Sequence, residues 1–383
     1  MIIGIDGNEA NVTKRVGIGE YAYQLLIQFE KIVAHRSDIT FVIYLKDEPL
    51  MHLPKATKRW KYRVIKPGKL WTQWRLPADL LLHRPKPDVF FSPSHYAPRI
   101  SPVPTVMSVM DVSYLKFPEL FHPKDLYQLK HWTEYSVKNA TRVLTISQSS
   151  RNDIIKSYKK DGNAVRVVYP GIKKAVTLEP KVYAMNQLAT KYNVSKNFVL
   201  FVGTLQPRKN IERLIESFSL LKSDEKLRKK LGDDLQLVII GKKGWLYEPI
   251  LEAPEKYGVK HDVLFLEGID DIELKEFYKH AQCYILPSLY EGFGLPVLEA
   301  MQHDCPVITS NISSLPEAGG DAAIYVDPNN VKDIADKIEQ VVSDKDLQKE
   351  LIAKGREQVK KFSWDKSAEK TLEILEEVVN NSK

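Results

Sequence analysis

Two acidic residues, Glu291 and Glu299, flank the glycine-rich stretch Gly-Phe-Gly-Leu-Pro-Val-Leu. The apolar run at residues 283–286 before it is typical of a buried parallel strand, and residues 297–301 after it read as the start of a helix. Pro296 suits the first helical position, because the N–H that proline lacks has no partner there in any case. A strand, a glycine turn and a helix start direct free backbone N–H groups at one point. The stretch therefore predicts an anion site, with phosphate as the expected ligand.

The two carboxylates need a different partner, because a carboxylate beside a phosphate site is no ligand for the phosphate. Each can accept hydrogen bonds from hydroxyl groups of a sugar or of a ribose. The alternative is structural: Glu299 would complement the dipole of its own helix, and Glu291 would be a solvated loop residue.

A second stretch, Gly-Thr-Leu-Gln-Pro-Arg-Lys-Asn at residues 203–210, follows another β-rich run. Asn210 is a good N-cap for a helix over residues 211–221, so Arg208 and Lys209 are expected at a strand-to-helix turn. Fixed cations there would stabilise negative charge on a bound anion, and the loss of one such donor costs on the order of 3 kcal/mol in a transition state. The alternative is a surface basic pair at a turn.

The two stretches, in this order, resemble the G-T-x-x-P-R-K-N and E-x7-E patterns of retaining glycosyltransferases of family 4. The resemblance implies the GT-B fold, with two facing Rossmann-like domains, and it implies that Glu291 contacts the donor sugar while Glu299 holds the ribose. Some relatives carry an arginine where Thr204 stands. Further residues implied to line the donor site are Gly203, Thr204, Gly268, Ile269, Ser288, Phe293, Gly294 and Leu295.

The first half of the chain carries weaker matches to the same family. Gly17 and Gly19 precede the first expected helix and resemble the glycine pair that approaches the donor phosphate, although a simple helix-start turn is the alternative. Residues 109–113 resemble the H-D-L segment on the acceptor side, with Met110 at the position of the histidine and Asp111 retained as a catalytic candidate. His95 and Tyr114 are the expected acceptor-binding residues, and a structural loop histidine is the alternative for His95.

The length of 383 residues suits two domains, and the composition, 43% hydrophobic and 27% charged, is that of a globular protein. No apolar run reaches the length of a membrane span, and the N-terminus reads as a strand and not as a signal peptide. Cys283 and Cys305 are expected to be small core residues. These features favour a cytoplasmic protein, with association at the inner face of the membrane as an option.

Charge is placed unevenly along the chain. Residues 1–170 hold 26 Lys and Arg against 15 Asp and Glu, which is +11, and the remainder holds 30 against 34, which is −4. Residues 55–75 contain eight cations and no acid, with Trp60, Trp71 and Trp74 among them. Such a segment suits an anionic membrane surface or a phosphate-bearing acceptor. A plain solvated face is the alternative, and no nucleic-acid motif accompanies the segment.

The pattern of apolar runs predicts an α/β protein with parallel, doubly wound sheets. The predicted N-terminal acceptor-binding domain covers residues 1–172, a linker occupies residues 171–195, and the donor domain covers residues 195–362. The last helix, at residues 363–383, is expected to return to the N-terminal domain. The expected strands lie at residues 2–6, 40–45, 62–65, 88–92, 103–109, 142–147, 165–169, 198–204, 235–241, 263–267, 283–287, 307–310 and 323–326.

The sequence as a whole predicts a retaining hexosyltransferase with mannose as the first choice of sugar. The donor would be a nucleoside-diphosphate sugar and the acceptor a glycan or lipid-linked oligosaccharide of a surface polysaccharide. No cofactor and no metal are expected, because Arg208, Lys209 and the helix N-terminus would neutralise the diphosphate. The alternatives are a non-catalytic nucleotide-sugar-binding scaffold and a sugar-nucleotide epimerase of the same fold. Neither the linkage nor the oligomeric state follows from these patterns.

Overall fold

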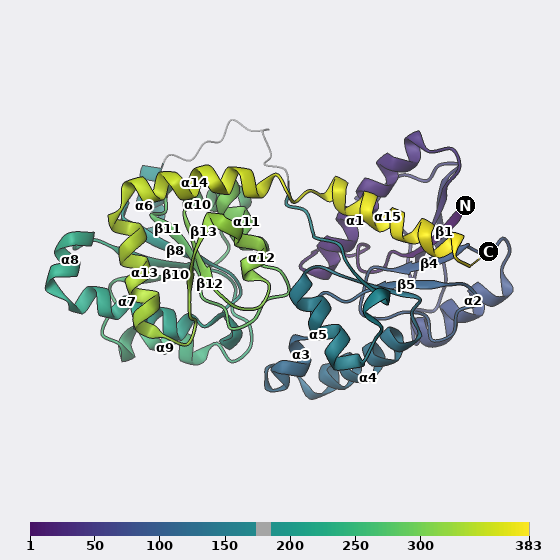
Figure 1. Ribbon diagram of the computed structural model, residues 1–383, viewed down its shortest axis with the longest axis horizontal. Coiled ribbons are helices and arrows are strands. Elements are labelled where there is room, and N and C mark those ends of the chain that lie inside the picture. Colours follow the sequence, from purple (N-terminus) through teal and green to yellow (C-terminus); the bar gives the residue numbers. More distant parts are fainter. Residues whose placement is uncertain (174–184, 383) are drawn as a thin grey trace. The chain divides into compact units, whose positions relative to one another are not determined.

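The computed structural model describes residues 1–173 and 185–382, which form two units (Figure 1). The N-terminal unit contains Met1–Gly171 and Phe362–Lys383, and the C-terminal unit contains Ile172–Lys361. Each unit is built around one parallel sheet with helices packed around it. The predicted α/β class with two doubly wound sheets is thereby confirmed.

The N-terminal sheet has seven strands in the order β3-β2-β1-β4-β5-β6-β7, and neighbouring strands are parallel. The chain runs outward from β1 to β3 and then resumes on the other side of β1 with β4, so the strand order reverses between β1 and β4. Ligands of open α/β sheets bind outside the carboxyl ends of the strands at such a reversal. The strands are β1 (Ile2–Asp6), β2 (Thr40–Leu45), β3 (Trp60–Val64), β4 (Val89–Ser92), β5 (Thr105–Ser108), β6 (Arg142–Thr145) and β7 (Val165–Val167).

The last helix, α15, belongs to the N-terminal unit and packs against α1. The Tyr21 and Trp364 rings meet edge to face at 5.9 Å, and the Ser367 hydroxyl donates to the carbonyl of Tyr169. This confirms the predicted return of the chain. The helices of this unit are α1 (Ile18–His35), η1 (Trp71–Arg75), α2 (Leu76–Leu82), α3 (Ser113–Lys116), η2 (Pro118–Leu120), α4 (Pro123–Asn139), α5 (Gln148–Tyr158), η3 (Gly162–Ala164) and α15 (Trp364–Asn380).

The C-terminal sheet has six strands in the order β10-β9-β8-β11-β12-β13, again parallel, with the reversal between β8 and β11. Strands covered on both faces need continuous apolar sequence, and Phe-Val-Leu-Phe-Val in β8 supplies it. The strands are β8 (Phe198–Val202), β9 (Gln236–Ile240), β10 (Val263–Leu266), β11 (Cys283–Leu286), β12 (Val307–Ser310) and β13 (Ala323–Val326).

Several helices of the C-terminal unit begin at a side-chain cap. Asp270, Asn330 and Asp344 each accept a hydrogen bond from a backbone N–H of the first turn that would otherwise lack an intrahelical partner. The helices are α6 (Met185–Tyr192), η4 (Pro207–Lys209), α7 (Ile211–Ser223), α8 (Glu225–Leu231), α9 (Glu248–Lys256), α10 (Asp271–His280), α11 (Leu295–Gln302), α12 (Leu315–Gly319), η5 (Gly320–Ala322), α13 (Val331–Ser343) and α14 (Lys345–Val359).

Part of the predicted linker is folded. Residues 174–184 lie outside the described residues, but α6 is a helix of the C-terminal unit, with Met185 and Leu188 buried. Its Lys191 ammonium lies 2.5 Å from the carboxylate of Glu273 on α10. The weak apolar pattern of this stretch concealed the helix, because only one narrow side of it is buried.

The predicted cap of α7 is wrong. Asn210 has the left-handed φ of 61°, and its side chain makes no capping bond. Its amide group donates instead to the carbonyls of Pro287, at 3.0 Å, and Pro328, at 2.7 Å. Asn210 therefore joins the turn after β8 to the loops after β11 and β13, and α7 begins without a side-chain cap.

The basic segment at residues 55–75 is not a uniform surface. Trp60 and Trp71 are buried core residues, while Trp74 is 69% exposed. Cys283 and Cys305 are buried free thiols, as predicted, and burial raises the pKa of Cys283 to about 12. Within the part of the chain that the structure describes, no helix is both long enough and apolar enough to span a membrane.

Candidate active site

A buried ionic cluster lies at the reversal point of the C-terminal sheet. Arg208 and Lys209 follow β8, while Ser288 and Glu291 follow the adjacent strand β11. We call these four residues the C-terminal cluster. Parallel neighbouring strands end at the same edge of a sheet, so two stretches about 80 residues apart in sequence are brought together.

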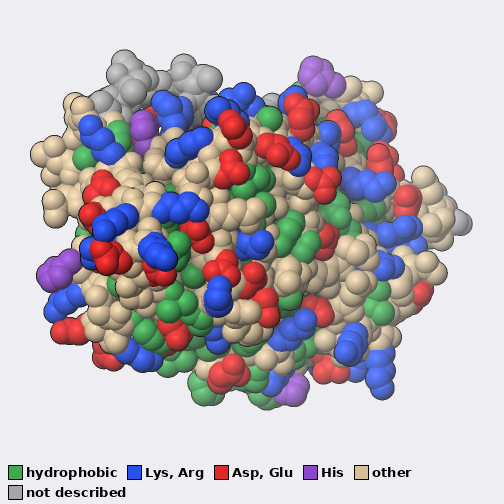
Figure 2. Space-filling view, turned by 60° about the vertical axis from the view of Figure 1, so that its left-hand side comes forward, with side chains coloured by type: hydrophobic (Ala, Val, Ile, Leu, Met, Phe, Trp, Pro, Cys, Tyr) green, Lys and Arg blue, Asp and Glu red, His purple; other side chains and the backbone are tan. Residues whose placement is uncertain are grey.

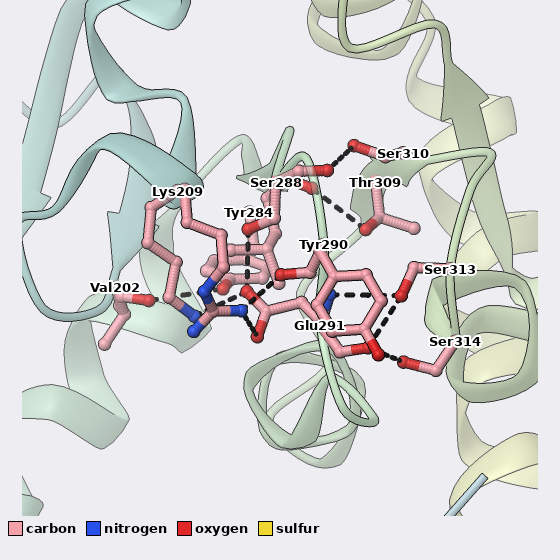
Figure 3. A network of polar contacts seen from close by, with 12 residues as sticks. Val202, Lys209, Tyr284, Ser288, Tyr290, Glu291, Thr309, Ser310, Ser313 and Ser314 are labelled. Carbon is pink, nitrogen blue, oxygen red and sulfur yellow. Dashed lines mark hydrogen bonds and ion pairs between the residues drawn. The ribbon is translucent and has the colours of Figure 1, made fainter. Parts of the chain in front are cut away.

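The Glu291 carboxylate is the centre of the cluster (Figure 3). Its Oε1 lies 2.5 Å from the Lys209 ammonium and accepts a hydrogen bond from the Ser288 hydroxyl at 2.7 Å. Its Oε2 lies 3.1 Å from the guanidinium of Arg208, which also donates to the carbonyl of Tyr290. The two predicted cations are therefore held in place by the predicted acid.

Burial by itself raises the pKa of Glu291, but the nearby charges of Lys209 and Arg208 outweigh it, and the pKa falls to about 2. Glu291 is therefore ionised at neutral pH. One carboxylate against two cations leaves a net charge of +1 at the ends of β8 and β11. Such a surplus, fixed in place before any ligand arrives, favours an anion.

The loop after β12 holds the backbone of the glutamate turn. The hydroxyls of Ser313 and Ser314 donate to the carbonyl of Glu291 at 2.7 and 2.8 Å, and Ser310 donates to the carbonyl of Ser288 at 2.8 Å (Figure 3). The sequence analysis missed these serines. The polar run Thr-Ser-Asn-Ile-Ser-Ser, which begins in the last two residues of the buried strand β12 and continues after it, was the available signal.

The glycine turn continues into helix α11, which begins at Leu295. Gly294 has φ +107°, and a Cβ there would lie 2.8 Å from the Leu315 side chain, so glycine is required. Phe293 is buried, and Pro296 is the second helical residue instead of the predicted first. The turn and the first N–H groups of α11 thus stand beside the C-terminal cluster.

Glu299 lies one turn into α11 and is half-buried. Burial raises its pKa, and the charge of Lys173 only partly opposes this. Glu291 and Glu299 therefore differ in environment: the first is neutralised by two cations, and the second is not.

The remaining predicted donor residues lie at the same end of the sheet. Gly203 and Thr204 follow β8, and a Cβ on Gly241 would meet the Gly203 carbonyl at 1.9 Å, so these two backbones pack in direct contact. Gly268, with φ +76°, and Ile269 follow β10 at the margin of the sheet. The structure places Gly268 and Ile269 two strands away from β8.

The N-terminal unit carries a second group of predicted residues at strand ends. Gly17 and Gly19 follow β1, His95 follows β4 and Asp111 follows β5. Gly17 has φ +51° before α1, and a Cβ on Gly19 would lie 2.9 Å from the Glu9 carbonyl. We call His95 and Asp111 the N-terminal cluster; they lie at or next to the reversal of this sheet.

The ring of His95 is placed unusually for a histidine. Its Nδ1 is buried and has no hydrogen-bond partner among the described residues. Burial lowers the pKa of His95, and the nearby negative charge of Asp111 opposes this. A neutral imidazole with a free buried nitrogen can accept or donate one hydrogen bond to a ligand. Asp111 itself accepts a hydrogen bond from the N–H of Ser113 at 2.8 Å.

The predicted acceptor-binding role of Tyr114 has no support in the structure. Tyr114 is 2% exposed, its ring lies edge to face with His95, and its hydroxyl is hydrogen-bonded to the hydroxyl of Tyr158. It is a core residue whose ring packs against the ring of His95. Met110 is half-buried and packs against the core of the unit.

Asp6 is a carboxylate that the sequence analysis did not select. It lies at the end of β1 and is 6% exposed; burial raises its pKa to about 6, against hydrogen bonds from Asn8. No group of His, Cys, Asp and Glu among the described residues is arranged to hold a metal ion.

The sequence of this chain is similar to those of known glycosyltransferases. A family model described as glycosyl transferases group 1 matches residues 187–358. The O-antigen chain mannosyltransferase B of Escherichia coli is 32% identical over 315 residues, which cover 81% of this chain and 78% of that protein. The serotype-specific mannosyltransferase WbdA of Escherichia coli is 30% identical over 248 residues, which cover 64% of this chain and 30% of that longer protein.

Solved structures agree in fold over nearly the whole chain. WaaG, a glycosyltransferase involved in lipopolysaccharide biosynthesis, superposes with a TM-score of 0.66 at 18% identity and covers 98% of this chain and 99% of its own. Anabaena HepE in complex with UDP-glucose superposes with a TM-score of 0.69 at 18% identity and the same coverage. The fold is GT-B, and since a relative is 32% identical over 81% of this chain, the chain belongs to the group 1 glycosyltransferases.

Proposed function

We propose that this glycosyltransferase moves a hexose, with mannose as the first choice, from a nucleoside-diphosphate sugar to a glycan or lipid-linked acceptor, with retention of configuration. The observation that carries the proposal is the C-terminal cluster: the buried Lys209 and the half-buried Arg208 on one buried carboxylate, at the reversal point of a parallel sheet and beside the start of α11. That arrangement suits a diphosphate better than any neutral ligand.

In the proposed reaction the bond between the anomeric carbon and the diphosphate breaks while the acceptor oxygen bonds to the same face of that carbon. The acceptor's proton passes to the departing phosphate oxygen, so no protein nucleophile is needed. Arg208 and Lys209 stabilise the leaving diphosphate, because its negative charge grows as the bond breaks. Glu291 holds both cations and orients the sugar, and Glu299 takes the ribose.

The choice of sugar rests on the relatives. Two of them carry mannosyltransferase names, which favours mannose and a guanosine diphosphate donor. HepE was solved with UDP-glucose, which keeps a uridine diphosphate donor as the second choice. A metal is not part of the proposal, since Arg208, Lys209 and the helix N-terminus would balance the diphosphate.

The proposal is tested by thermal unfolding with GDP, UDP, ADP and TDP, each with and without EDTA. A nucleotide at about one hundred times its Kd stabilises a protein by about 2.7 kcal/mol. We expect GDP to raise the unfolding temperature selectively, and EDTA to leave that rise unchanged. A rise that EDTA abolishes would contradict the metal-free site, and no rise with any nucleotide would contradict the donor site itself.

Product analysis separates the remaining alternatives. Transfer of labelled mannose to an acceptor, with the α configuration of the donor kept, is the expected result. Inversion at C2 of a free nucleotide sugar without transfer would identify an epimerase instead.

A further inference from the structure

We propose that the outer face of η1 and α2 is a docking surface for an anionic lipid bilayer. The two helices run without a break from Trp71 to Leu82 in the N-terminal unit. Figure 1 shows α2 at the periphery of that unit. We define the α2 face by four apolar residues and three cations: Leu70, Trp74, Leu81, Leu82, Lys69, Arg75 and Arg84.

The helices are apolar on their outer side as well as their inner side. On the inner side, Trp71, Leu76 and Leu80 pack against Tyr44 and Phe90 in a buried cluster. That packing anchors the helices to the sheet and leaves the outer side to be explained separately.

On the outer side, Trp74 is 69% and Leu82 83% exposed, with Leu81 at 43%. The spacing of Trp74, Leu81 and Leu82 keeps these three residues on one side of the helical segment. A helix that needs only one apolar side for its own core does not need three large apolar residues exposed to water on the other side.

Leu70 extends the same face under strain. It stands before η1 with φ 52° in the left-handed region, where a Cβ is unfavourable, and it is 50% exposed. A leucine held in this conformation and turned toward solvent gains nothing from the fold itself. Residues in such strained backbone conformations often lie where a protein binds a ligand or a surface.

All three charged residues of the α2 face are cations. Between Glu48 and Asp88 the sequence has a single acid, Asp79. Its carboxylate forms a bidentate ion pair with the guanidinium of Arg63, in which Nε lies 2.6 Å from Oδ2. Lys69, Arg75 and Arg84 are exposed, and no carboxylate among the described residues lies within ion-pair distance of any of them.

The loop after β4 adds to this side, because the N–H of Arg99 donates to the carbonyl of Thr72 at 2.8 Å. By contrast, the face drawn in Figure 2 mixes cations and acids throughout. Exposed Trp and Leu ringed by cations complement the interfacial zone of an anionic bilayer.

This inference rests on the proposed function and favours a lipid-linked acceptor, since such an acceptor lies at a membrane surface. Its test is independent of the donor site: the full chain, without nucleotide, is floated with vesicles of phosphatidylcholine alone or with added phosphatidylglycerol. We expect flotation with the anionic vesicles only. Each cation near an anionic surface strengthens binding about fivefold, so K69Q/R75Q/R84Q should lower partitioning about a hundredfold.

The matched control is K332Q/K349Q/K354Q, which removes the same charge from α13 and α14 of the C-terminal unit and should bind like the wild type. W74S/L82S should also lose flotation, while M51S/L246S, which alters exposed apolar residues elsewhere, should keep it. All variants change exposed side chains and should keep the nucleotide-induced thermal shift. Equal loss in both charge variants, or flotation of W74S/L82S like the wild type, would overturn the proposal. So would a wild-type dimer that W74S/L82S converts to monomer, because a second copy would then cover the face.

Discussion

In the C-terminal cluster, the carboxylate of Glu291 accepts hydrogen bonds from Lys209, Ser288 and Arg208. In the N-terminal cluster, the Nδ1 of His95 is buried without a partner among the described residues. Both clusters occupy strand ends of similar sheets, so topology does not explain the contrast. The first is complete before any ligand binds, and the second leaves one hydrogen bond to be made.

The contrast follows from what each cluster is proposed to handle. Cations that meet a diphosphate need a counter-ion in the free protein, because two like charges buried together would repel each other and lose hydration. A group that recognises a neutral hydroxyl needs the opposite, a free donor or acceptor in a dry place. The two clusters therefore represent two kinds of preorganisation, one of charge and one of hydrogen-bonding capacity.

The largest effect is expected for K209M. Removing the ammonium deprives the leaving diphosphate of a fixed cation, and transfer should fall by about 10²–10³-fold. Glu291 is also left with less compensation, so the free energy of unfolding should fall by about 3 kcal/mol. Steady-state transfer and urea unfolding measure the two effects.

The double variant K209M/E291Q separates catalysis from folding. It removes both charges of the closest pair, so most of the lost stability should return, because no carboxylate remains buried with too little positive charge. Transfer should stay low. If the double variant regained transfer as well, Lys209 would be a structural residue and the comparison of the two clusters would fail.

The acid sensitivity of the C-terminal cluster gives the next effect. The pKa of Glu291 is about 2 in the folded protein against an ordinary 4.5, so its contribution is complete above about pH 4.5 and is lost as the pH falls through 2. The difference amounts to about 3 kcal/mol. Urea unfolding from pH 7 to pH 2.5 should show a steep acid loss in the wild type and a shallower one in E291Q.

Glu299 provides a control of opposite sign. Its pKa is raised by burial, so its protonated form is favoured in the folded protein and ionisation costs stability as the pH rises. E299Q should therefore leave the acid loss in place and add stability at neutral pH. Identical acid limbs for wild type and E291Q would show that the cations do not hold Glu291 as described.

The residues of the first cluster were easier to select from the sequence than those of the second, because they stand in recognisable continuous stretches. Glu291, Arg208 and Lys209 lie in two continuous stretches, each with its own strand and turn, so each could be recognised locally. The strands at residues 2–6, 307–310 and 323–326 were predicted with the bounds the structure has, because a buried parallel strand rich in apolar residues can be recognised locally.

What the sequence could not predict depends on contacts between distant residues. Asparagine is a residue type that often caps a helix, yet the side-chain amide of Asn210 donates to the carbonyls of Pro287 and Pro328. Ser313 and Ser314 act through the backbone of Glu291, which no local pattern reveals. Tyr114 follows Asp111 closely in sequence but points into the core, because α3 turns it toward Tyr158.

The smallest effect concerns His95 and decides whether the second cluster is a site at all. If its Nδ1 binds the acceptor, H95A should raise the KM for the acceptor about tenfold, the worth of one hydrogen bond of about 1.4 kcal/mol. Hydrolysis of the donor in the absence of acceptor should not change. Asparagine places its amide near the position of Nδ1 and glutamine near that of Nε2, so H95N should recover more of the acceptor KM than H95Q.

Y114F is the matched control, since it removes a hydroxyl beside His95 that is already bonded to Tyr158. It should lower the free energy of unfolding by about 1 kcal/mol and leave the acceptor KM unchanged. Recovery by H95Q and not by H95N would assign the contact to the other ring nitrogen. A fall in donor hydrolysis equal to the fall in transfer would show that His95 does not bind the acceptor. Its buried Nδ1 would then be a polar group that lacks a hydrogen-bond partner in the bound protein as well.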